Sequence, residues 1–140
     1  MKFLKRTEIN TYIKANVLDG ITENNDLLLD DIEAIAISEI DSYIGGKYNT
    51  ITIFDKKGNN RNAYIISLVI DIMLFHLYSR IAPDNIPEIR LQRYAKGIEW
   101  LENVAKGKVS PNLPILDKTY DNRSSEILYG SFPKINNESL

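Results

Sequence analysis

The segment from Ala63 to Leu77 constrains the fold more than any other part of the chain, because it is apolar nearly all round a helix. A helix on the surface of a protein has one apolar stripe, whereas a helix without a polar face has to be covered on several sides. The segment is shorter than the roughly 20 residues that cross a bilayer, and Asp71 and His76 interrupt it. We therefore predict a helix from about Asn62 to Ser79 that is buried in protein, with no role for a membrane.

Two further helices are predicted before this central one. The first follows Thr7, a residue type suited to an N-cap, and covers Glu8 to about Ala15. The second runs from about Asp26 to Ile44 and ends at Gly45-Gly46, where glycine can take the left-handed conformation of a C-cap. Residues 18–26 between them are rich in Asn, Asp and Gly, and we predict a loop there.

Two segments break the helical pattern. In residues 50–60 the run Ile51–Phe54 favours extended structure and Asp55–Gly58 has turn chemistry, which predicts a short hairpin or an ordered loop. From Lys108 onward the chain has three prolines and no sustained periodicity, which predicts an extended arm. The predicted fold class is all-α: a small bundle of about four helices with an extended or hairpin insertion at about 50–60. Residues 1–107 would form the helical core domain and residues 108–140 the C-terminal arm.

The fourth predicted helix begins near Pro87 and continues to about Lys106, with Gly107 as its end. One side has the spacing of a core stripe, formed by Leu91, Tyr94, Ala95, Ile98, Leu101 and Ala105. A second side surrounds the only tryptophan of the chain and consists of Ile89, Arg93, Trp100 and Val104. Trp and Arg are enriched among the residues that anchor protein interfaces. The second side requires a cover as well, and either the C-terminal arm or another subunit would supply it.

Polar residues in the apolar helix predict a structural network. Asp71 would need a partner if buried, and Arg90 or Arg93 from the next helix are candidates. His76 and Arg80, four residues apart, share the opposite side of the helix. We assign Asp71, His76, Arg80 and Arg90 to structural polar contacts.

Catalytic and metal-binding functions are disfavoured by the residues present. His76 is the only histidine, and the chain contains neither a Gly-x-Ser-x-Gly elbow nor a His-Glu-x-x-His pair. Cysteine is absent, which removes disulfides, thiolate metal sites and a cysteine nucleophile. We expect a protein without enzymatic activity, metal or cofactor.

The charge distribution argues against tight binding of nucleic acid, because the net charge is -2. Acidic residues are concentrated between Asp19 and Asp41, a stretch without Lys or Arg. This stretch forms either an ordinary solvated face or a wall that lets DNA pass without adhering. The N-terminal sequence becomes charged before any long apolar run, so we expect no secretion signal.

Residues 61–114 resemble a family of small tailed-phage proteins found in Mu-like prophages and classed as head-completion or head-tail joining proteins. The resemblance is strongest at Asp71, Phe75-His76-Leu77, Arg80, Pro83, Ile86-Pro87-Glu88, Arg93-Tyr94-Ala95, Trp100-Leu101, Ala105, Gly107 and Pro111–Pro114. The end of the second helix, "IDSYIGGKY", and the tail "YGSFPKINN" are also similar to members of the family. The linker at residues 50–60 departs from the shorter, proline-containing linker of much of the family.

The resemblance implies a mostly helical, non-enzymatic subunit of a ring that joins the portal of the filled head to the tail. Its partners would be further copies of itself and neighbouring portal or tail proteins, with DNA passing through without tight binding. It would be located in the cytoplasm during assembly and then in the virion. The alternative is a small helical adaptor or regulatory binding protein that does not enter the particle.

Overall fold

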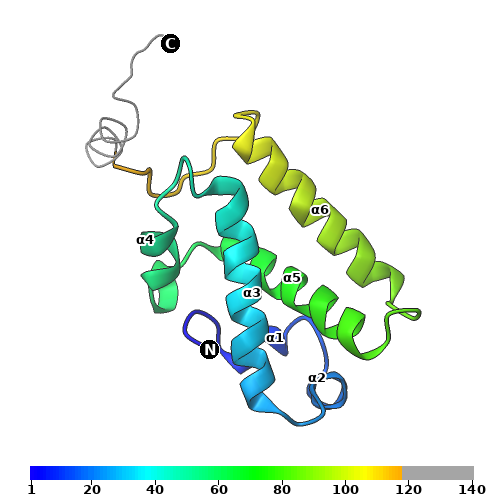
Figure 1. Ribbon diagram of the computed structural model, residues 1–140. Helices are drawn as coiled ribbons and strands as arrows, with labels where there is room; N and C mark the ends of the chain where they lie inside the picture. The colour runs from blue at the N-terminus through cyan, green and yellow to red at the C-terminus, as the bar shows by residue number, and fades with distance from the viewer. Residues whose placement is uncertain (118–140) are drawn as a thin grey trace, which may run out of the picture.

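The computed structural model describes residues 1–117, which fold into α-helices joined by short connections (Figure 1). Three long helices dominate: α3 (Asp26–Ile44), α5 (Ala63–Ile81) and α6 (Glu88–Ala105). Shorter elements are α1 (Arg6–Ile9), α2 (Ala15–Thr22), α4 (Thr50–Asp55) and the 3₁₀ helix η1 (Gly58–Asn60). The all-α fold class predicted from the sequence is confirmed.

Helix α5 is the centre of the core, as its all-round apolar sequence predicted. It contacts α3, α6 and α2, and its buried residues run from Ile65 to Leu77. The side chain of Asn62 caps its first turn by accepting hydrogen bonds from the main-chain N–H groups of Tyr64 and Ile65. Within the described residues, α5 is the one helix long and apolar enough to cross a membrane. Its packing between other helices accounts for that composition.

Helix α3 has the predicted bounds, although its C-terminal cap differs from the prediction. Gly45 has φ −64° and is therefore right-handed, so the predicted left-handed cap is wrong. A glycine is needed there for another reason: a Cβ atom on Gly45 would lie 2.6 Å from the main-chain oxygen of Asp41. At the other end, the Asn25 side chain accepts a hydrogen bond from the N–H of Leu27 and caps the first turn.

The predicted hairpin at residues 50–60 is wrong, because this segment forms α4 and η1. The Asn49 side chain accepts a hydrogen bond from the N–H of Thr52 and so starts the helix. Ile53 and Phe54 are buried, and the ring of Phe54 packs edge-on against Phe3 at 5.1 Å between centroids. Burial of these two side chains overrides the β propensity of the segment.

The N-terminal region also differs from the prediction. The helix predicted at residues 8–15 is a single turn, α1, and part of the predicted loop at 18–26 is helical as α2. Leu18 and Ile21 of α2 are buried, which explains why the helix forms despite Gly20.

The chain before α1 is attached to α3 by a buried carboxylate. Glu33 accepts main-chain hydrogen bonds from Lys2, Phe3 and Leu4, with N···O distances of 2.9, 3.2 and 2.8 Å. Glu33 is only 2% exposed, so these N–H groups satisfy an acidic side chain that the sequence placed on a solvated face.

Helix α6 ends as predicted, and Gly107 follows with φ +81°. Residues 108–117 then lie against the connection between α3 and α4. Tyr48 and Ile115 form an isolated antiparallel bridge, with hydrogen bonds from Asn49 N to Pro114 O and from Leu116 N to Lys47 O. This first part of the predicted arm thus covers a site away from the outer side of α6. Residues 118–140 of the arm, including "YGSFPKINN", lie outside the described residues.

Candidate subunit interface

One flank of α6 combines exposed apolar residues with fixed charges. Ile89, Arg93, Lys96 and Trp100 follow each other at the spacing of one helix face, and we call this set the α6 flank. Ile89 is 50% exposed. Beside the set lies an open depression of about 540 Å³, lined by Ile89, Gln92, Arg93, Ala95, Lys96 and Glu99. The flank therefore offers a hollowed surface on which an exposed isoleucine lies among charged side chains.

Trp100 is partly buried and packs against the edge of the core. Its indole ring meets the ring of Tyr64 from α5 at 4.7 Å between centroids, with the planes tilted by 53°. Tyr64 itself is 48% exposed. The two rings form a supported aromatic pair whose outer surface is open, an arrangement typical of interface anchors. Tyr64 was not predicted from the sequence, because it comes from a different helix.

Arg93 is positioned by α5. Its Nε donates a hydrogen bond of 2.7 Å to Oδ1 of Asp71, and its guanidinium lies 5.8 Å from the centre of the Tyr12 ring. The hydrogen bond to Asp71 raises the pKa of Arg93. Asp71 is buried, whereas 42% of the Arg93 side chain is exposed. Of the two partners predicted for Asp71, Arg93 is confirmed; Arg90 is wrong.

The placement of Val104 on the second side of the helix is wrong, because Val104 is 1% exposed and belongs to the core. Leu91 and Ala95, predicted in the core stripe, are exposed. The side of α6 that faces the core is thus centred on Gly97, Leu101 and Val104 and is rotated away from the predicted stripe. A Cβ atom on Gly97 would lie 2.7 Å from Leu68 Cδ1, so the missing side chain lets α6 approach α5 closely on this side.

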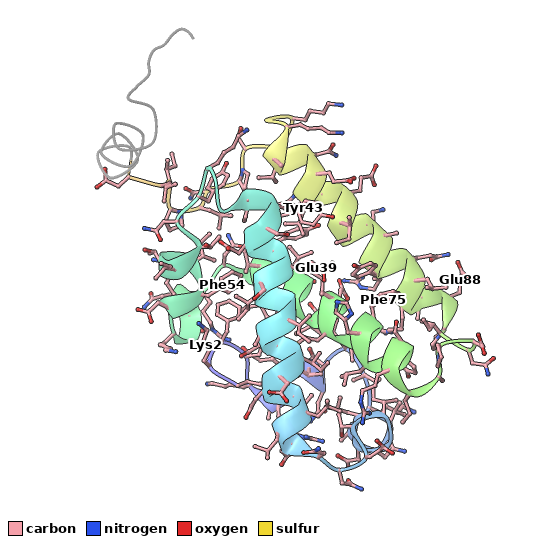
Figure 2. The ribbon with its side chains drawn as sticks, in the orientation of Figure 1. Lys2, Glu39, Tyr43, Phe54, Phe75 and Glu88 are labelled. Carbon is pink, nitrogen blue, oxygen red and sulfur yellow. The ribbon has the colours of Figure 1, made fainter. Side chains whose placement is uncertain are left out.

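The other predicted polar residues make separate contacts. His76 Nε2 lies 2.8 Å from Glu39 Oε1, and the Tyr94 hydroxyl donates a hydrogen bond to the second oxygen of Glu39. Burial, reinforced by this hydrogen bond, raises the pKa of Tyr94. The Tyr94 ring stacks on Phe75 at 3.9 Å, and Figure 2 shows Glu39 and Phe75 in the region where α3, α5 and α6 converge.

Arg80 and Arg90 do not join this cluster. Arg80 forms an exposed ion pair with Glu23 at 3.2 Å. Arg90 has a buried Nη1 without a hydrogen-bond partner in the described residues. Three of the four predicted polar residues, Asp71, His76 and Arg80, therefore make separate contacts that link α5 to α6, α3 and the end of α2, whereas Arg90 makes none of them.

No group of three or more His, Asp or Glu side chains in residues 1–117 is arranged to hold a metal ion. On the α6 flank, an exposed isoleucine and an aromatic pair lie beside an arginine that an internal carboxylate holds in place.

A sequence-family model described as Bacteriophage Mu, Gp36 matches residues 3–127 of the chain. The match spans all of the helices from α1 to α6. No curated protein and no solved structure matches the chain.

Proposed function

The chain belongs to the bacteriophage Mu Gp36 family and is a protein of Mu-like phages, and on this premise we propose that it is a non-enzymatic subunit of the head-tail connector ring. Its partners are further copies of itself and the adjoining portal or tail proteins. Assembly takes place in the bacterial cytoplasm, and the protein remains in the virion.

The observation that carries the proposal is the exposed α6 flank. Ile89 is half exposed on the same helix face as Arg93, which is bound to Asp71 of α5. Such a surface is already rigid, so a partner binds it without first ordering it. Residues 108–117 run toward the α3–α4 connection, so within residues 1–117 the C-terminal arm does not cover the flank.

The acidic residues of α3 fit a subunit past which DNA moves. Asp31 is exposed on this helix, outside the linings of the depressions beside α4. Like-charged surfaces repel the phosphate backbone, which favours passage over adhesion.

The substitution Ile89→Asp tests the proposal. The charge is expected to block packing at the α6 flank while the exposed site leaves the fold intact, so particles made by a phage carrying the variant should lack joined heads and tails. Electron microscopy of lysates would count free heads and tails. Leu91→Asp, two residues away on the outer side of α6, is the matched control and should yield normal particles. Normal joining by Ile89→Asp particles would contradict the assigned face.

Trp100→Ala probes the same flank and is expected to give a folded chain that fails to assemble. Because Trp100 also packs against Tyr64, the substitution can lower the stability of the fold. The thermal unfolding of the Trp100→Ala variant therefore has to be measured in parallel.

The alternative function is a small adaptor that regulates another protein and does not enter the particle. Mass spectrometry of purified virions separates the two functions. Several copies per particle support the connector subunit, whereas absence of the chain from complete particles supports the adaptor.

A further inference from the structure

A second exposed apolar surface lies on the side of α3 that faces α4. Two adjoining depressions, of about 250 and 470 Å³, share Lys2, Ile37 and Ser38 in their linings. Ile51 of α4 stands at the edge of the smaller depression and is 84% exposed. We call this surface the α3–α4 groove. Ile51 and the half-buried Ile37 give this surface its apolar area.

The groove and helix α6 lie on opposite sides of α3 and α5. Figure 2 shows Lys2 and Phe54 on the α4 side of α3, with Glu88 at the start of α6 on the far side. In Figure 1, α3 and α5 stand between α4 and α6. Two different apolar surfaces on opposite sides of one subunit fit a heterologous contact, in which each copy binds the next by unlike faces.

The charges of the two surfaces are complementary. Asp41 and Asp55 line the smaller depression of the groove together with Lys2, whereas Arg93 and Lys96 line the α6 depression together with Glu99. Within residues 1–117, neither Asp55 nor Lys96 has an ion-pair partner. Lys2 in the groove and Glu99 in the α6 depression are not in these ion pairs either, but the net charges still differ in sign. Lys2, Asp41 and Asp55 sum to −1, and Arg93, Lys96 and Glu99 sum to +1.

We infer that the occupant of the α3–α4 groove is the α6 flank of a second copy of this chain. Ile89 and Trp100 of one copy pack against Ile37 and Ile51 of the next, and Lys96 faces Asp55 across the contact. The inference rests on the proposed function, because it names the partner of the same α6 flank. Repetition of this contact around an axis closes the ring.

Paired cysteines test the contact directly, because the natural chain contains no cysteine. A chain carrying both Lys96→Cys and Asp55→Cys is to be incorporated into phage particles and treated with a short bismaleimide. Cross-linking between unlike faces is expected to give a ladder of dimers, trimers and larger species on a denaturing gel. Chains carrying only one of the two cysteines should remain monomeric, since each contact then has a single thiol.

The control chain combines Asp55→Cys with Glu102→Cys, which is exposed on the outer side of α6 away from the flank. It should give no ladder. Dimers from either single variant would indicate contact between like faces and would overturn the inference. So would cross-links from Asp55→Cys to a different protein or within one chain.

Charge reversal supplies a second test that does not depend on the reach of a cross-linker. Lys96→Asp and Asp55→Lys are each expected to reduce incorporation into particles, and the double variant should restore it. Failure of the double variant to restore incorporation would contradict the pairing.

The presence of the chain in particles is measured in the cross-linking samples as well. A chain that is present in particles but gives no ladder refutes only the contact between the groove and the flank. Absence of the natural chain from particles refutes the connector function.

Discussion

At the scale of single residues, the buried carboxylate of Asp71 joins the core to the α6 flank. Removing one partner of a buried ion pair costs about 3–5 kcal/mol, but the exposed side of Arg93 regains water when the pair is broken. We therefore expect Asp71→Asn to lower the free energy of unfolding by about 1–3 kcal/mol in urea titrations.

The exposed pair formed by Arg80 and Glu23 is the control for this prediction. Arg80→Gln should change the free energy of unfolding by less than about 0.5 kcal/mol, because surface ion pairs contribute little. Equal effects of the two substitutions would show that burial of Asp71 does not matter to the stability of the fold.

Glu8 gives the fold a defined dependence on pH. Its carboxylate accepts hydrogen bonds from Arg61, and this interaction lowers the pKa of Glu8 below its ordinary value of 4.5. The charged form of Glu8 is therefore more stable in the folded chain, where Arg61 binds it, than in the unfolded chain. Its contribution to stability is complete above the unfolded pKa and is lost as the pH falls through the folded pKa.

The substitution Glu8→Gln should accordingly lower stability near neutral pH and make the decline below about pH 5 shallower. Unfolding free energies measured from pH 7 downward would show the two curves converging. Glu99→Gln, at an exposed position on α6, should instead leave the shape of the curve unchanged. Parallel curves for Glu8→Gln and the natural chain would contradict the assigned role of Arg61.

At the scale of secondary-structure elements, the contact between α5 and α6 depends on Gly97. A leucine here would meet Leu68 across the interface and push the helices apart. We expect Gly97→Leu to lower the free energy of unfolding by about 1–3 kcal/mol in urea titrations. Ala95→Leu, on the exposed side of α6, should stay within about 0.5 kcal/mol. A neutral Gly97→Leu would show that the helices do not approach closely at this glycine.

The same glycine explains why the sequence predicted the wrong rotation of α6. Counting apolar residues favours the side of Leu91 and Ala95, because glycine adds nothing to such a count. In the structure the close approach at Gly97 decides which side is buried, and Val104 is buried with it. Of the predicted second side, Ile89 is half exposed, Trp100 is partly buried against the core, and Val104 is fully buried.

The long helices were predictable because their ends are marked in the sequence. Asn25 and Gly45 flank α3, and Asn62 precedes α5. The short helices α2 and α4 were missed because their stability comes from distant contacts. Phe54 packs on Phe3, and no pattern within residues 50–60 reveals that partner.

At the scale of the whole molecule, a rigid core presents two unlike surfaces on opposite sides. Helix α5 fixes the positions of α3 and α6, and these helices in turn hold the α3–α4 groove and the α6 flank at a constant separation. In the proposed ring, the relative orientation of the two surfaces would set the rotation from one copy to the next and hence the number of copies. Tyr64 and Lys2 belong to these surfaces through tertiary structure, so the complete faces were beyond prediction from helical periodicity alone.

The most direct measurement is a cryo-electron microscopy reconstruction of the neck of purified particles. We predict a ring between portal and tail in which this helical fold repeats, with the α6 flank of each copy against the α3–α4 groove of the next. A neck built entirely from other proteins, with this chain absent from the particle, would contradict the connector function.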